Sequence, residues 1–130
     1  MKEKEIKVLK IEPKKTPEIV VLKNELHELQ KAVSISAPNI GLIEIIEINS
    51  DVCILCNEEG KLIGLEPNRR FCNDIICGVF YLTGQDYEKG DLKSLPEHLV
   101  KYYSEKFATP DVISSDEVDK TIISQFYIID

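Results

Sequence analysis

Apolar and polar residues alternate in two segments near the start of the chain. Residues 6–12 (IKVLKIE) and 18–22 (EIVVL) are rich in branched side chains, and Pro13 and Pro17 bound the segment between them. Alternation interrupted by a short proline-bounded loop is typical of two antiparallel strands. We therefore predict that the chain opens with a β-hairpin.

Two later segments have the apolar spacing of amphipathic helices. The first follows Asn24, a good capping residue, and its apolar positions are Leu22, Leu26, Leu29 and Val33. The second begins at Ser94, an expected cap, with Pro96 in the first turn and Glu97 three residues after the cap. Its apolar positions are Leu95, Leu99, Tyr102 and Phe107. We expect both helices to pack on a sheet.

Further strands are expected over residues 42–48, 52–56, 61–63, 74–83 and 121–129. Residues 52–56 (VCILC) are apolar almost throughout, which indicates burial on both faces. Gly60 is expected to take the left-handed conformation in the hairpin loop NEEG. We expect an irregular connection over residues 64–73 and an exposed acidic linker over 108–120. The element order predicts an α+β fold, a mostly antiparallel β-sheet with two helices packed on one face.

The composition supports one domain with a buried core, since 43% of the 130 residues are hydrophobic and 30% are charged. No apolar run reaches the roughly 20 residues of a membrane-spanning helix. The first residues, MKEKEIKVLK, contain no apolar segment typical of a signal peptide. We therefore expect a cytoplasmic protein that does not bind membranes.

The charge is negative overall and unevenly distributed. The formal net charge is -7, which disfavours nucleic-acid binding because such binding requires Lys and Arg to neutralise phosphates. Residues 41–60 contain no Lys or Arg and five acids: Glu44, Glu47, Asp51, Glu58 and Glu59. Such a segment is either a solvated surface or an acidic face that binds a basic partner, and both interpretations stay open.

The four cysteines have the spacing C-x2-C-x15-C-x4-C, formed by Cys53, Cys56, Cys72 and Cys77. This spacing resembles a zinc ribbon. However, residues three apart in a strand point to opposite faces, so the first two thiols would diverge. We therefore expect core cysteines, no metal site and no cofactor. Neither His27 nor His98 has a nucleophile or metal partner nearby in the sequence, and no catalytic residue is assigned.

Polar residues are concentrated in NEEGK and NRR, two segments that a hairpin could place at one end of the sheet. The candidate ligand- or partner-binding residues are Asn57, Glu58, Glu59, Lys61, Asn68 and Arg69. Carboxylates, amides and a guanidinium suit a polar ligand or a protein contact. The alternative is a plain turn and a capping loop, in which Arg69 and Arg70 pair with surface acids.

The segments NEEGKLIGLEPNRRF and DIICGVFYLTG, with the opening KVLKIEP and the helix ELHELQKAV, resemble a family of small domains of unknown function. Phages and mobile elements of Gram-positive bacteria encode many members. The resemblance implies a core over residues 6–107, with a flexible basic N-terminus over 1–5 and an extension over 108–130 that ends in a strand. The segment SISAPNIG departs from the usual short link after the first helix.

The resemblance implies an accessory protein of a phage or mobile element. For such a small protein we expect non-enzymatic, stoichiometric binding to a host protein or to a small polar or nucleotide ligand, with counter-defence as one purpose. A small enzyme acting on a nucleotide, or an assembly module, is the alternative. The absence of a recognisable nucleophile or metal motif favours binding over catalysis. Because residues 121–129 (TIISQFYII) combine high β-propensity with no charge, we also expect a homodimer formed by pairing of this edge strand.

Overall fold

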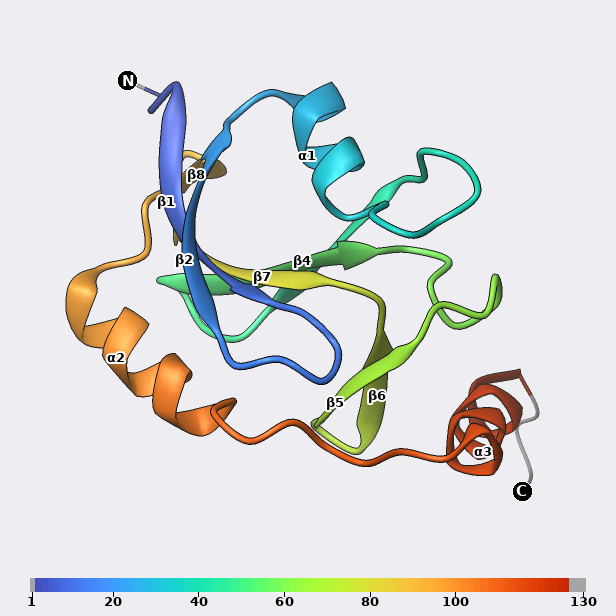
Figure 1. Cartoon of the computed structure of the whole chain (residues 1–130). Coiled ribbons are helices and arrows are strands. Elements are labelled where there is room, and N and C mark those ends of the chain that lie inside the picture. The colour runs from blue at the N-terminus through green and yellow to red at the C-terminus, as the bar shows by residue number, and fades with distance from the viewer. Residues whose placement is uncertain (1, 127–130) are drawn as a thin grey trace.

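The computed structural model describes residues 2–126, which form eight strands and three helices (Figure 1). The strands are β1 (Glu5–Ile11), β2 (Glu18–Lys23), β3 (Ile43–Glu47), β4 (Val52–Asn57), β5 (Pro67–Phe71), β6 (Asp74–Cys77), β7 (Phe80–Asp86) and β8 (Asp91–Lys93). The helices are α1 (Leu26–Ala32), α2 (Glu97–Lys106) and α3 (Ser115–Phe126).

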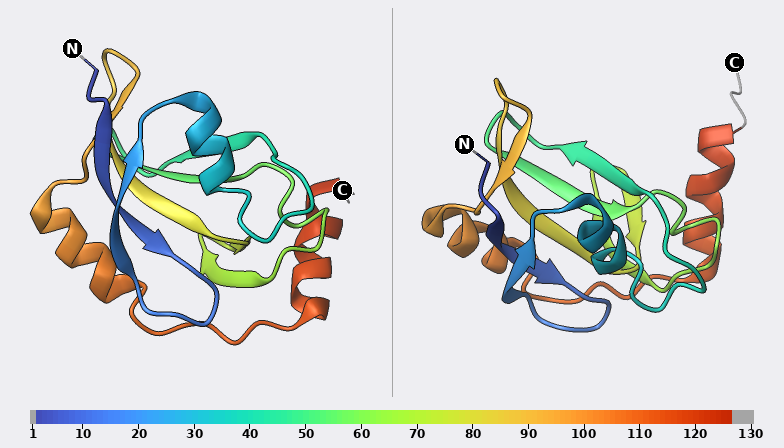
Figure 2. Two further views of the ribbon diagram at one scale, coloured as in Figure 1. Left: turned by 45° about the horizontal axis from the view of Figure 1, so that its top comes forward. Right: turned by 90° about the horizontal axis from the view of Figure 1, so that it is seen from above.

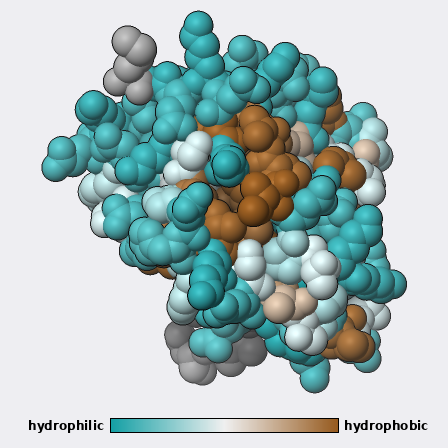
Figure 3. Space-filling view, turned by 60° about the vertical axis from the view of Figure 1, so that its left-hand side comes forward, coloured by the Kyte–Doolittle hydropathy of each residue, from teal (hydrophilic) through white to brown (hydrophobic). Residues whose placement is uncertain are grey.

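Six strands form one antiparallel sheet in the order β2-β1-β7-β4-β3, with β8 paired to β7. Strands β5 and β6 form a separate antiparallel pair. The predicted α+β class is confirmed, and so is the opening hairpin, in which β1 and β2 pair from Glu5↔Lys23 to Lys10↔Glu18. The side of the molecule that carries this hairpin exposes a patch of apolar side chains (Figure 3).

Alternate side chains of β1, β4 and β7 build two apolar layers, because successive residues of a strand point to opposite faces. One layer packs against α2 and includes Leu9, Ile54, Phe80, Tyr103 and Phe107. The other packs against α1 and includes Val8, Leu55, Tyr81, Leu29 and Val33. Helices therefore cover both faces of the large sheet (Figures 1 and 2). Every residue of β4 is buried, as its apolar sequence predicts.

Both predicted helices are present, but their expected caps have other partners. The N-cap position of α1 is Glu25, and the Asn24 side chain instead donates hydrogen bonds to the carbonyl oxygens of Glu3 (2.9 Å) and Leu92 (3.3 Å). The N-cap of α2 is Pro96, while Ser94 Oγ accepts the backbone N–H of Lys7 at 2.9 Å. These side chains connect the starts of the helices to the N-terminal segment and β8 and do not cap the helices.

The region between β4 and β7 differs most from the expectation. Residues 58–64 form turns, so the strand predicted over 61–63 is wrong, and β5 lies where an irregular connection was expected. The single strand predicted over 74–83 is divided into β6 and β7 at Gly78, whose φ of 85° takes the chain out of extended geometry.

The strand predicted over residues 121–129 is also wrong where the structure describes it. Residues 115–126 are helical, and the rest of the predicted strand lies outside the described residues. Val118 and Ile122 lie one turn apart on α3 and pack with Ile75 and Cys77 of β6. The edge-strand basis for the expected homodimer is therefore absent in residues 121–126.

Candidate functional site

The six predicted site residues do not form one site. Asn57, Glu58 and Lys61 line a cavity at the surface, and Glu59 is exposed on the adjoining turn. Asn68 and Arg69 are 0% and 1% exposed and lie in β5, and neither of them lines that cavity. The expected single cluster is therefore divided into a surface part and a buried structural part.

Asn68 joins three segments of the chain. Its Nδ2 group donates to the carbonyl oxygens of Ile11, at the end of β1, and of Gly78, at 2.9 and 2.8 Å. Its Oδ1 atom accepts a hydrogen bond from Arg69 Nη1 at 2.8 Å. An amide with all these partners inside the protein is positioned for structure, not for binding a ligand.

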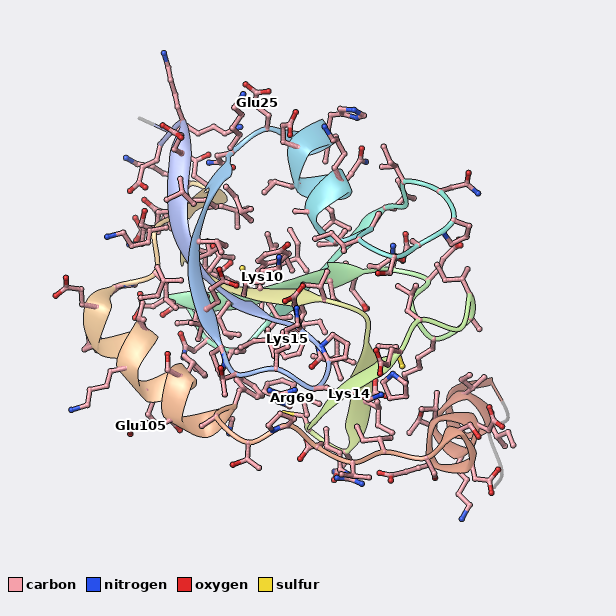
Figure 4. All side chains as sticks on the ribbon, viewed as in Figure 1. Lys10, Lys14, Lys15, Glu25, Arg69 and Glu105 are labelled. Carbon is pink, nitrogen blue, oxygen red and sulfur yellow. The ribbon has the colours of Figure 1, made fainter. Side chains whose placement is uncertain are left out.

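Arg69 is a buried cation whose hydrogen-bond acceptors all belong to the protein. Besides Asn68, its guanidinium donates to the carbonyl oxygens of Lys15 (2.7 Å) and Phe107 (3.0 Å). Lys15 and Arg69 are marked in Figure 4. Burial lowers the pKa of Arg69, and the charge of Asp111 opposes that shift. The predicted pairing with surface acids is confirmed for Arg70, which contacts Glu117 at 2.6 Å, but is wrong for Arg69.

The surface part is a cavity of about 400 Å³ between β3, β4, the 58–62 turn, β6 and α3. Apolar side chains that line it include Ile46, Ile75, Ile76 and Ile122. Its polar lining residues include Glu44, Asn57, Glu58, Lys61 and Asp74. Lys61 Nζ forms an ion pair with Asp74 Oδ1. Acidic groups thus outnumber basic ones beside an apolar wall.

Asn57 and Gly60 shape the turn that forms one wall. Asn57 is buried, its Oδ1 accepts the Glu59 N–H at 2.9 Å, and its Nδ2 donates to Ser34 Oγ at 3.4 Å. Gly60 does not have the left-handed conformation that the sequence suggested. Instead, a Cβ at this position would lie 2.6 Å from the Cys77 carbonyl oxygen. A glycine is needed there because two backbone segments approach closely.

Glu44 is the important cavity residue that the predicted site lacked. Residues 44 and 56 are directly paired between β3 and β4, and the Cys56 thiol lies 3.7 Å from Glu44 Oε1. The signal was present in the sequence, because Glu44 belongs to the acidic run over residues 41–60. What the sequence did not supply was the register that brings Glu44 to the same cavity as Glu58.

The cysteines near the cavity are protonated core residues. Burial, together with the nearby charge of Glu44, raises the pKa of Cys56 to about 12, and burial raises that of Cys77 to about 11. Cys53 is buried as well, whereas Cys72 is exposed. The core interpretation is thus confirmed for three of the four thiols. Within residues 2–126, no group of three or more His, Cys, Asp or Glu is arranged to hold a metal ion.

These features define a small α+β domain with an acidic, apolar-walled surface cavity. The family model for a domain of unknown function (DUF3846) matches residues 6–108, and the chain belongs to that family. No curated protein and no solved structure matches the chain significantly. The match ends before α3, so the helix that contributes Ile122 to the cavity lies outside the family domain. None of the described helices is long and apolar enough to cross a membrane.

Proposed function

We propose that this protein acts by stoichiometric binding of a basic protein partner at the acidic cavity, and not by catalysis. The observation that carries this proposal is the combination of Glu44 and Glu58 with an apolar wall. A Lys or Arg side chain fits this arrangement, because its alkyl stem packs on apolar groups while its cation meets carboxylates. The partner's charge also complements the acidic run over residues 41–60.

A nucleotide or another phosphate ligand is disfavoured by the same charges. Lys61 is the basic group among the described lining residues, and it is already paired with Asp74. Phosphate oxygens in the cavity would face Glu44 and Glu58 without a free cation to balance them. Catalysis by Cys56 or Cys77 is disfavoured as well, because thiols with pKa values of about 12 and 11 remain protonated at neutral pH.

The proposed biological setting is that of an accessory protein of a phage or mobile element, acting in the cytoplasm of its bacterial host. The resemblance of NEEGKLIGLEPNRRF to domains that such elements encode supports this setting. A small protein that binds a host protein one to one can block it without chemistry of its own. Counter-defence, in which the blocked protein belongs to a host defence system, is the purpose we propose.

The test is an affinity pull-down from host lysate with wild-type protein and the double variant Glu44→Gln/Glu58→Gln. Glu97→Gln/Glu105→Gln is the matched control, because it removes two exposed carboxylates from α2, away from the cavity lining. We expect wild type and control to retain the same protein, and the Glu44/Glu58 variant to bind it about tenfold more weakly, a loss of about 1.4 kcal/mol. Equal retention by all three proteins would refute the proposed site.

A further inference from the structure

We propose that β3 is a docking edge to which the partner adds one extended strand, with Lys or Arg side chains alternating with apolar ones. This inference rests on the proposed function, since it specifies how the basic partner reaches the cavity. Addition of a peptide strand to an exposed sheet edge is a recurring mode of recognition, in which backbone hydrogen bonds give affinity and alternate side chains give specificity.

The backbone of β3 is open along one side. β3 is the last strand of the large sheet and pairs with β4 alone within the described chain (Figure 2). The Leu42 carbonyl accepts the Glu58 N–H at 3.0 Å, and the Ile48 N–H donates to the Val52 carbonyl at 3.1 Å. Even-numbered residues therefore direct their backbone groups to β4. The N–H and C=O groups of the odd-numbered residues, Ile43, Ile45 and Glu47, point away from β4 to the edge.

Each face of this edge carries a cavity. The side chains of Glu44 and Ile46 line the acidic cavity described above. On the opposite face, Ile43 and Ile45 line a groove of about 490 Å³ whose other apolar residues include Leu26, Leu42 and Leu55, and Glu58 lines this groove as well as the acidic cavity. Because side chains of an added strand lie beside the residues they oppose, alternate side chains of the partner would enter the two cavities in turn.

The charges and apolar groups define the chemistry of that strand. The face with Glu44 favours Lys or Arg, and the face with Ile45, which is 54% exposed, favours apolar residues. A second copy of β3 is a poor occupant. It would bring Glu44 and Glu47, and no cation, to an edge that already carries these two carboxylates.

The opposite sheet edge, β2, is the rival surface. β2 exposes Ile19 and Val21, at 55% and 58%. A groove beside β2 is lined by Lys10, Lys23 and Lys31 and by one acid, Glu28. That edge therefore suits an acidic strand, and it serves as an internal comparison for a basic one.

The test uses wild-type protein and a synthetic peptide of about ten residues in which lysine and valine alternate. Hydrogen exchange of individual amides is followed by NMR. We expect saturating peptide to slow exchange at Ile43, Ile45 and Glu47 by about tenfold or more, and to leave Ile19, Val21 and Lys23 unchanged. A peptide of the same composition with its lysines in one block, and one N-methylated at alternate residues, should give no protection.

Ile45→Pro is the decisive variant, and Val21→Pro is its matched control. Each replaces a residue whose N–H points away from the neighbouring strand, a position where proline is tolerated. We expect Ile45→Pro to weaken peptide binding about tenfold or more and Val21→Pro to leave it unchanged. If Ile45→Pro fails to fold, the N-methylated peptide with wild-type protein gives the same comparison.

The inference and the proposed function can fail separately. The peptide could bind wild type, lose binding in Glu44→Gln/Glu58→Gln, and yet give no amide protection in β3. That result would overturn strand addition but would still support the acidic cavity as the binding site. Protection of β2 amides, equal binding of the block peptide, or concentration-dependent protection of β3 without peptide would also overturn the inference. The last result would identify a second copy of the chain as the occupant.

Discussion

Arg69 in β5 and Phe107 at the end of α2 are joined by a hydrogen bond of 3.0 Å from Nη2 of the guanidinium to the Phe107 carbonyl. This bond places a buried cation at the C-terminus of a helix, where the helix dipole favours positive charge. It also fixes α2 against β5, 38 residues earlier in the chain. A residue predicted to bind a ligand is therefore a connection between elements of the fold.

The first prediction concerns that connection. Arg69→Ala removes the donor for the Phe107 and Lys15 carbonyls and for Asn68 Oδ1, and buried acceptors without donors are costly. We expect a loss of about 3 kcal/mol or more in the free energy of unfolding, measured by urea denaturation. Arg70→Ala, at an exposed neighbour, should cost far less. Similar losses in both variants would contradict the structural role of Arg69.

The second prediction separates two reasons for a glycine. Gly60→Ala should destabilise the protein by about 1–3 kcal/mol, because its Cβ would lie 2.6 Å from the Cys77 carbonyl oxygen. Gly64 has open space around it but a φ of 76°. Gly64→Asn should therefore be tolerated, since asparagine accepts left-handed geometry, whereas Gly60→Asn should not. Denaturant midpoints of the four variants Gly60→Ala, Gly60→Asn, Gly64→Ala and Gly64→Asn test this, and a tolerated Gly60→Asn would refute the steric explanation.

Much of the fold could be predicted because local patterns and tertiary structure agree in it. The alternation in residues 6–12 and 18–22 corresponds to β1 and β2, and the apolar run VCILC corresponds to β4. The C-terminal segment was mispredicted because Ile122 and Ile123 favour strands locally. In the fold, Val118 and Ile122 instead pack one helical turn apart on β6, and tertiary contacts outweighed local propensity.

The candidate site was predicted in part for a similar reason. Asn57, Glu58 and Lys61 are close in sequence, so one turn was enough to bring them to the cavity. Asn68 and Arg69 have the same polar side chains but lie in a strand, and nothing local indicates that their partners would be Ile11 and Phe107. Burial of a polar residue depends on the acceptors that distant segments supply, which a single sequence does not reveal.

The third prediction is that the thiols react in two classes. The exposed Cys72 should react with a thiol reagent in the native protein, and Cys53, Cys56 and Cys77 should react only after unfolding. Cys72→Ser should show no reaction when native.

Because burial raises the pKa of Cys53 and Cys56 to about 12, from 9.0, unfolded chains lose these protons first as pH rises. Stability from these groups is complete below pH 9 and falls between pH 9 and 12. For the reactivity classes, a fast reaction of the native Cys72→Ser variant with the thiol reagent would contradict the burial of Cys53, Cys56 and Cys77.

The fourth prediction concerns how α3 is held beside the cavity. Arg70 forms two charge-assisted bonds to Glu117, at 2.6 and 2.8 Å, and these hydrogen bonds lower the pKa of Glu117 below its usual 4.5. A carboxyl group with a lowered folded pKa stabilises the folded state above its unfolded pKa, and this contribution is lost as pH falls through the lowered value. Docking of α3 should therefore weaken below pH 4.5. The measurement is amide hydrogen exchange across Ser115–Phe126 as a function of pH.

Two variants distinguish this ion pair from general acid destabilisation. Glu117→Gln should raise α3 exchange at neutral pH, because an amide cannot replace a carboxylate opposite a guanidinium, and it should flatten the pH dependence. Asp119→Asn, an exposed acid on the same helix, should behave as wild type. Val118 and Ile122 still pack on β6 in both variants, so the helix should remain formed. If Glu117→Gln retains the full acid response, the α3 contact is held by apolar packing and not by the Arg70–Glu117 pair.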